Sequence, residues 1–211
     1  IKKSKFVDRI IVCTSDEKSD DELENICKHG DIDIYRGSLS NVMERIVKCA
    51  NKFKTKKIIE ILGDNPLIDG KLIDDVINLS DTQKFDYVAN ISKDYKKEIQ
   101  NKKYKLFPIG LRVQIYNTET AKEYLNFNEK KFISSHPTNF IFESKNMFKC
   151  GFFEAKNNWK FVNLEDLNFA INNKTQFNNV KNIFEYFKDE NFSIKDTIEY
   201  LKKYELFKNF I

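Results

Sequence analysis

The residue best placed to do chemistry is Asp64, which stands in Gly63-Asp64-Asn65-Pro66 directly after a short apolar run. The run over 57–62 is typical of a buried strand, and ligands of open α/β sheets bind beyond the carboxyl ends of strands. A carboxylate there could hold Mg²⁺ against phosphate oxygens, because Mg²⁺ takes few protein carboxylates and keeps its other positions for water and phosphate. Gly, Asp, Asn and Pro are also common turn residues, so a simple turn is the alternative interpretation.

Strands and helices are expected to alternate in the first half of the chain. Asn41 and Glu44 have the spacing of a capping box at the start of one helix. Repeated βα units predict a mostly parallel sheet with right-handed crossovers. The expected strands are 9–13, 32–35, 57–62 and 85–91, and the expected helices are 20–29, 42–50 and 70–79.

The second half has a different pattern. Residues 92–105 are polar and rich in Lys, which predicts a loop or flap. Strands at 139–144 and 148–155 would form an antiparallel excursion over the sheet. Other strands are expected at 109–116 and 159–162, and helices at 118–125, 165–169, 179–188 and 193–205. We expect one domain over 1–211, with a flap or insertion over 92–158 and C-terminal helices over 179–211.

Composition excludes several classes of protein. The net charge of +4 is small against 36 basic and 32 acidic residues, so it gives no argument for nucleic acid binding. No apolar run approaches the roughly 18 residues that span a membrane. The four cysteines form no C-x-x-C pair and predict reduced thiols in a cytoplasmic protein. The two histidines have no ligand-like spacing to them.

The order of motifs resembles the cytidylyltransferases that activate acidic sugars, above all the branch similar to spore coat polysaccharide biosynthesis protein F. The acylneuraminate cytidylyltransferases are similar at a greater distance. The motifs span nearly the whole chain in the family's order. They are Asp8-Arg9-Ile10-Ile11-Val12, Tyr35-Arg36-Gly37-Ser38, Val42-Met43-Glu44-Arg45, Gly63-Asp64-Asn65-Pro66-Leu67-Ile68-Asp69, Asp86-Tyr87-Val88-Ala89-Asn90, Phe107-Pro108-Ile109-Gly110-Leu111, Ser135-His136-Pro137-Thr138 and Asn191-Phe192-Ser193-Ile194-Lys195-Asp196.

This resemblance implies an α/β fold, a three-layer α/β/α sandwich of the nucleotide-diphospho-sugar transferase (Rossmann-like) type with a mostly parallel sheet. It implies Mg²⁺-dependent transfer of CMP from CTP to an acidic sugar or related precursor of surface polysaccharide, and a possible homodimer. Asp64 would be the catalytic metal ligand, with Asn163 at the position of a second ligand. The nucleotide- or substrate-binding residues would be Arg36, Gly37, Ser38, Asn65, Asn90, Arg112 and His136. A solvated arginine at a strand end is the alternative interpretation of Arg36, and a structural histidine that of His136.

Three departures from the family pattern are visible. The family's first strand and its Gly- and Arg-rich phosphate loop are expected before Ile1. Arg112 stands where the family usually has an acid. Asn163, or Val162 in the ungapped alignment, takes the position of the acid of the late motif. Asn163 would offer Mg²⁺ a neutral oxygen only, although Asp166 could compensate.

Two alternatives to cytidylyl transfer therefore stay open. One is a degenerate, non-catalytic homologue that binds a nucleotide-sugar or a partner. The other is a glycosyltransferase, because one fold serves several chemistries.

Overall fold

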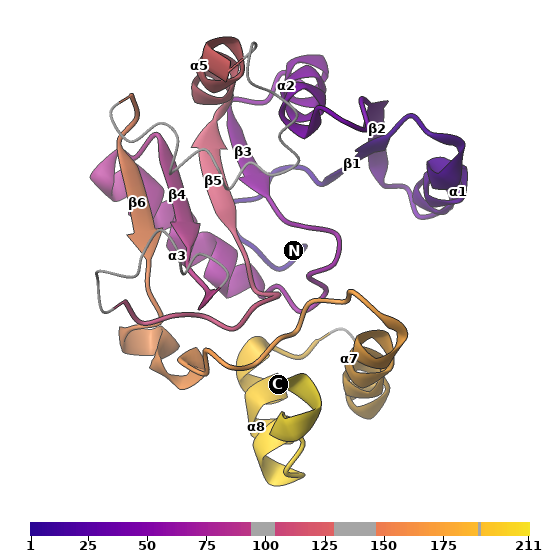
Figure 1. The fold of residues 1–211 in the computed structure, drawn as a ribbon, viewed down its shortest axis with the longest axis vertical. Helices are drawn as coiled ribbons and strands as arrows, with labels where there is room; N and C mark the ends of the chain where they lie inside the picture. The colour runs from indigo at the N-terminus through magenta and orange to yellow at the C-terminus, as the bar shows by residue number, and fades with distance from the viewer. Residues whose placement is uncertain (94–103, 129–146, 190) are drawn as a thin grey trace.

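The structure is a computed structural model that describes residues 1–93, 104–128, 147–189 and 191–211 (Figure 1). Its strands are β1 (Ile11–Ser15), β2 (Asp33–Gly37), β3 (Lys57–Glu60), β4 (Tyr87–Asn90), β5 (Gln114–Asn117) and β6 (Cys150–Phe153). Its α-helices are α1 (Asp21–His29), α2 (Val42–Lys52), α3 (Gly70–Gln83), α5 (Thr118–Asn128), α7 (Lys174–Phe187) and α8 (Ile194–Lys203). Short 3₁₀ helices are η1 (Lys18–Asp20), η3 (Asn157–Val162) and η4 (Phe207–Phe210). None of these described helices is long and apolar enough to cross a membrane.

The strands form two hydrogen-bonded ladders. β1 pairs with β2 in parallel, and a four-stranded sheet has the order β3-β5-β4-β6. β5 is antiparallel to both of its neighbours, whereas β6 is parallel to β4. β3, β4 and β6 therefore run in one direction, which confirms the mostly parallel sheet. In the described part of the chain, no ladder joins β1 to β3.

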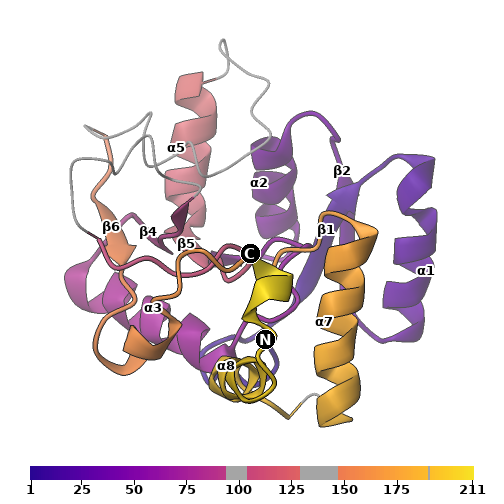
Figure 2. The same ribbon diagram turned by 60° about the horizontal axis from the view of Figure 1, so that its bottom comes forward.

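Helices cover both faces of the sheet and make three layers (Figure 2). The pleat separates two buried clusters, because successive side chains of a strand point to opposite faces. One cluster packs α3 and α8 against the sheet through Leu72, Ile73, Val76, Val88, Ile115, Ile198 and Leu201. The other packs α2 and α5 against the opposite face through Met43, Val47, Tyr87, Ala89, Tyr116, Ala121 and Tyr124. The three-layer α/β/α sandwich is confirmed.

Three expected elements differ from the structure. Residues 159–162 belong to the 3₁₀ helix η3, in which Trp159 and Val162 are both buried three positions apart, a spacing that a strand does not give. The helix expected at 165–169 is absent, because Asn168 instead forms a parallel bridge with Ile109. β6 joins the central sheet parallel to β4, whereas the segment 148–155 was expected to lie over the sheet. The strand expected at 139–144 lies outside the described residues.

The loop after β3 ends at Asp69, whose carboxylate caps two helices. Oδ1 accepts a hydrogen bond of 2.7 Å from the backbone nitrogen of Lys71 in the first turn of α3. Oδ2 accepts one of 3.0 Å from the backbone nitrogen of Ile194, the first residue of α8. Both nitrogens are donors that a helix leaves without an internal partner. One carboxylate thus fixes the far end of the Asp64 loop to two helices.

Gly110 lets two backbone segments approach closely beside the same loop. Its φ of +88° is a conformation that L side chains rarely adopt. A Cβ there would lie 2.2 Å from the nitrogen of Ala170 and 2.4 Å from the carbonyl carbon of Phe169. Only glycine therefore allows the segment before β5 to pack against residues 169–170.

Replacing Asp69 with Ala should lower the free energy of unfolding by about 1–2 kcal/mol, because two helix-start donors lose their acceptor. Urea denaturation followed by circular dichroism measures the change. Asp69→Asn keeps one acceptor oxygen and should lose less. Equal midpoints for Asp69→Ala and the unsubstituted protein would contradict the double-cap role.

Gly110→Ala should destabilise the protein by at least about 2 kcal/mol, because it adds backbone strain to a direct overlap with residues 169–170. Gly63→Ala is the matched control, since a Cβ at Gly63 meets nothing within 4 Å. The two thermal midpoints should differ clearly, with the Gly63 variant close to the unsubstituted protein. Similar midpoints for both variants would argue against the close approach.

Candidate active site

Asp64 lies where the sequence predicts, in the loop that follows the carboxyl end of β3. A turn in which the amide of Asn65 donates to the carbonyl of Leu62 at 3.1 Å shapes this loop. The Asp64 carbonyl accepts a hydrogen bond of 2.9 Å from the amide of Ile171. Its side-chain Oδ1 is buried and has no hydrogen-bond partner among the described residues. A buried carboxylate oxygen without a donor has unused capacity for a ligand.

This orphaned oxygen fits a Mg²⁺ ion. Carboxylate oxygens are preferred ligands of Mg²⁺, which commonly keeps several waters and uses one or two protein carboxylates alongside substrate phosphates. The described residues contain no group of three or more His, Cys, Asp or Glu side chains that could hold a metal on their own. Asp64 is therefore suited to a metal that arrives with phosphate oxygens, and not to a closed structural metal site.

Asn90 is buried at the end of β4 and holds the backbone on both sides of Arg112. Its Nδ2 donates to the carbonyl of Leu111 at 2.6 Å, and its Oδ1 accepts from the amide of Val113 at 2.7 Å. These two bonds satisfy backbone groups just before β5 begins. Asn90 therefore fixes the position from which the Arg112 side chain extends.

Glu60 is a further candidate residue of this site that its sequence motif did not indicate. It ends β3 opposite Gln114 of β5, and its Oε2 accepts a hydrogen bond of 2.7 Å from the hydroxyl of Tyr116. Burial raises the pKa of Glu60 to about 7, although the Tyr116 hydrogen bond and the charges of Arg112 and Arg45 oppose this rise. The sequence does contain one indication of this residue, because Glu60 is an acid within the apolar run 57–62.

Glu60 also gives a reason for the base at position 112. The positive charge of Arg112 acts on the Glu60 carboxyl and favours its ionised form. Position 112 therefore carries a charge opposite to that of Glu60 on the neighbouring strand. Arg112, at a position where the sequence resemblance leads us to expect an acid, thus has an oppositely charged partner in this fold.

Arg36 is bound within the protein at the end of β2. Its Nη1 forms ion pairs with Asp21 at 2.7 Å and Glu24 at 2.6 Å. Its Nε donates to the carbonyl of Ser15, and its Nη2 to that of Glu17. These bonds tie β2 to α1 and to the end of β1, which is a structural role, and nucleotide binding by Arg36 stays a prediction.

Gly37 and Ser38 lie against α2. A Cβ on Gly37 would lie 3.2 Å from Cγ of Arg45, and Nη1 of Arg45 donates to the Ser38 carbonyl at 2.9 Å. The Ser38 hydroxyl accepts from the amide of Asn41, the N-cap residue of α2. These contacts give the 37–38 backbone a defined position, while its ligand role stays a prediction.

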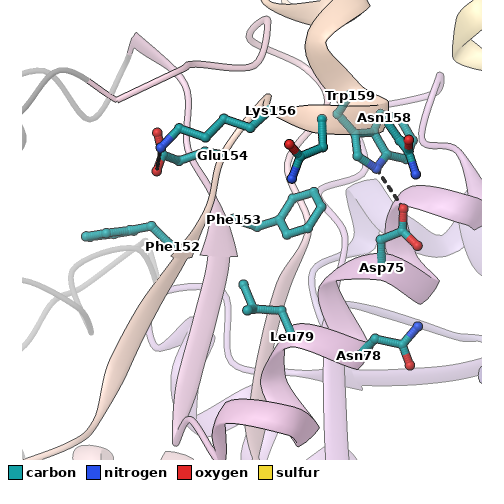
Figure 3. A pocket seen from close by; sticks show the side chains of 10 residues that line it. Asp75, Asn78, Leu79, Phe152, Phe153, Glu154, Lys156, Asn158 and Trp159 are labelled. Carbon is teal, nitrogen blue, oxygen red and sulfur yellow. Dashed lines mark hydrogen bonds and ion pairs between the residues drawn. The ribbon is translucent and has the colours of Figure 1, made fainter.

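A separate hollow of about 390 Å³ lies between α3, β6 and η3 (Figure 3). None of the residues that line it comes from the loop after β3. Its carboxylates already have partners, since Asp75 binds Nε1 of Trp159 and Nζ of Lys71, and Glu154 pairs with Lys156. With two acids and one lysine in its lining, this hollow does not suit a triphosphate.

The geometry at the strand ends can be compared with known proteins. A model of the cytidylyltransferase family matches residues 1–209. The chain belongs to the cytidylyltransferase family. It is therefore a nucleotidyltransferase of the kind that uses CTP.

Individual relatives of this cytidylyltransferase are distant. It is 26% identical over 209 residues to an uncharacterized protein of Methanocaldococcus jannaschii, covering 99% of this chain and 79% of the relative. It is 24% identical over 180 residues to the spore coat polysaccharide biosynthesis protein SpsF of Bacillus subtilis, covering 84% of this chain and 68% of SpsF.

Solved structures share its fold. A cytidylyltransferase from Leptospira borgpetersenii has a TM-score of 0.76 at 23% identity, with 97% of this chain and 80% of that chain covered. The 4-diphosphocytidyl-2C-methyl-D-erythritol synthase of Anaerococcus prevotii has a TM-score of 0.56 at 13% identity, with 85% and 82% covered.

The structure gives less support to the site roles of the remaining predicted residues of this cytidylyltransferase. Asn65 is buried beside Asp64. Asn163 is exposed at the end of η3, and it is Ile171, eight positions later, whose amide reaches Asp64. Asp166 lies in a turn, where it pairs with Lys93 at 3.5 Å. His136 lies outside the described residues. The metal role of Asn163 stays a prediction.

The raised pKa of Glu60 predicts a pH-dependent stability. The folded carboxyl takes up its proton at about pH 7, and its ordinary value is 4.5. Its stabilising contribution is therefore complete below pH 4.5 and is lost as the pH rises through 7. Glu60→Gln removes this loss, so from pH 5 to pH 8 the variant should gain about 1–3 kcal/mol relative to the unsubstituted protein.

Urea denaturation at pH 5 and pH 8 tests this expectation. Glu22→Gln on the exposed surface of α1 is the matched control, and its difference from the unsubstituted protein should not change with pH. A Glu60→Gln difference that is equally flat would show that Glu60 titrates normally.

Proposed function

We propose that this chain transfers CMP from CTP to an acidic sugar or related precursor of surface polysaccharide, in a Mg²⁺-dependent reaction. The observation that carries the proposal is the buried, unpartnered Oδ1 of Asp64 beyond the carboxyl end of β3. Membership of the cytidylyltransferase family supports the use of CTP. The similarity to SpsF, named for spore coat polysaccharide biosynthesis, supports the class of product.

In the proposed reaction an acceptor oxygen attacks the α-phosphorus of CTP and the bond to pyrophosphate breaks. Such chemistry depends mainly on positioning and charge neutralisation. Asp64 would hold Mg²⁺, which supplies positive charge against the phosphate oxygens. The hydrogen bond from Ile171 fixes the backbone of Asp64, so its carboxylate is positioned before the ligand binds.

Arg112 would attract an anionic group of the nucleotide or of the acceptor. Its backbone is held on both sides by Asn90, which limits the freedom of the base of the side chain. The positive charges of Arg112 and Arg45 both act on the single carboxyl of Glu60. The cluster therefore has a net positive charge whether or not Glu60 is protonated, which suits an acidic substrate.

A second candidate is a homologue that binds a nucleotide-sugar without turning it over. Asn163, which stands at the family's second acidic position, is neutral and exposed. Arg36 is already bound by Asp21 and Glu24. Both observations remove charge that a catalytic site would use, so the test must separate binding from turnover.

With an acidic sugar supplied as acceptor, Asp64→Asn in the full-length protein should lower Mg²⁺-dependent pyrophosphate release from CTP by roughly 100-fold or more, because the metal loses its charged ligand. Calorimetry with CTP, with and without Mg²⁺, measures binding in parallel. Asp31→Asn is the matched control, because Asp31 occupies an exposed turn with a φ of +50°, which Asn tolerates.

The outcomes separate the candidates. Loss of turnover and of Mg²⁺-dependent binding in Asp64→Asn alone supports the transferase. Binding of CTP or a CMP-sugar without turnover in the unsubstituted protein supports the non-catalytic homologue. Binding that is indifferent to Asp64 contradicts both the metal role and the proposed site.

A further inference from the structure

A stripe of side chains on α2 lies over the β1–β2 ladder. Arg45, Cys49 and Lys52 are spaced by four and three residues, so they share one face of the helix. Cγ of Arg45 would be 3.2 Å from a Cβ on Gly37, and Nζ of Lys52 lies 5.6 Å from the ring centre of Tyr35. Cys49 therefore lies on the helix face that covers this ladder.

Cys13 points into the same space from β1. It pairs in register with Tyr35 of β2, and paired residues of neighbouring strands place their side chains on the same face of a sheet. The two thiols also act on each other electrostatically, since Cys49 lowers the pKa of Cys13 and Cys13 raises the pKa of Cys49. Cys13 and Cys49 thus face each other across the contact between α2 and the ladder, while Cys27 on α1 and Cys150 on β6 belong to other parts of the fold.

From this juxtaposition we infer that Cys13 and Cys49 are a peroxide-oxidisable thiol pair that forms a disulfide between β1 and α2. Disulfide geometry requires Cβ atoms about 4 Å apart, and cysteines that face each other across a packed helix–strand contact need only a small movement to meet it. The resulting bond would fasten α2, and with it Arg45, to the strand it covers.

The environment of Cys13 favours its role as the attacking sulfur. The interaction with Cys49 lowers the pKa of Cys13, and the neighbouring Arg45 guanidinium lowers it further. Cys13 is partly exposed, whereas Cys49 is buried. Cys150 is a natural comparison, because it is also partly exposed but burial raises its pKa to about 11.

The reaction balances with one hydroperoxide. The Cys13 thiolate attacks the terminal peroxide oxygen, the O–O bond breaks, and the alcohol or water that leaves takes up a proton. Cys13 is now a sulfenic acid. The sulfur of Cys49 attacks it, the S–S bond forms, and the hydroxyl leaves with the Cys49 proton as water. Two thiols are oxidised by two electrons and one peroxide is reduced.

The test treats the reduced full-length protein with equimolar hydrogen peroxide, alkylates the remaining thiols with N-ethylmaleimide, and maps the peptides by mass spectrometry. The expected product is a linked pair of peptides containing Cys13 and Cys49, about 2 Da lighter than the sum of the two thiol peptides. Cys27 and Cys150 should stay alkylated, and Cys13 should react at least about tenfold faster than Cys150.

Variants identify the two roles. Cys49→Ser should leave Cys13 as a sulfenic acid that dimedone traps, and Cys150→Ser should behave as the unsubstituted protein. Equal rates at Cys13 and Cys150, or oxidation of Cys13 to sulfinic acid without a linked peptide, would overturn the inference. Because the unsubstituted protein gives this answer, the test does not depend on a variant that folds.

Discussion

The backbone of residues 167–171 hydrogen-bonds to two separate segments at the site, and the position of the site depends on these bonds. The amide of Ile109 donates to the carbonyl of Leu167, and that of Phe169 donates back to Ile109. Two residues later, Ile171 donates to Asp64. One strip of chain therefore joins the segment that leads to Arg112 with the loop that carries Asp64. The contact between the two segments requires glycine at position 110, because a side chain there would overlap the backbone of residues 169–170.

The same strip shows why the sequence predicted some elements and not others. Helices with a clear apolar stripe and an N-cap, such as those that follow Asn41 and Ser193, begin where the sequence indicates. The segment 165–169 has acids that suit a helix start, yet its backbone groups are used by Ile109. These bonds join positions nearly sixty residues apart and leave no pattern in the local sequence. Local helix propensity therefore predicted a helix at 165–169 that does not form. β5 runs antiparallel to both of its neighbours, and its own residues do not specify this direction, because strand direction depends on the path of the chain that leads into the strand.

The candidate site, like the fold, could be predicted only in part from the sequence. Asp64 could be placed because an apolar run followed by Gly-Asp-Asn-Pro fixes both the strand and its end. The bonds that Arg36 makes could not be read from the sequence, because Asp21 and Glu24 reach it across a helix–strand contact. Glu60 was missed because an acid in an apolar run is normally a solvated residue at a strand edge. Only the fold shows that the Tyr116 hydroxyl donates to Glu60 and that the charges of two arginines act on it.

Proton uptake by Glu60 is expected to be coupled to anion binding at Arg112. Its proton affinity reflects burial, opposed by the positive charges of Arg112 and Arg45. An anion held by Arg112 would offset part of that positive charge and make the Glu60 carboxylate costlier to maintain. Anion binding and proton uptake at Glu60 would then favour each other, since linkage between two sites is reciprocal. Arg112 thus does more than balance the charge of Glu60. Its charge can attract an acidic substrate, and it acts on a partly buried acid whose pKa of about 7 lets that acid respond near neutral pH.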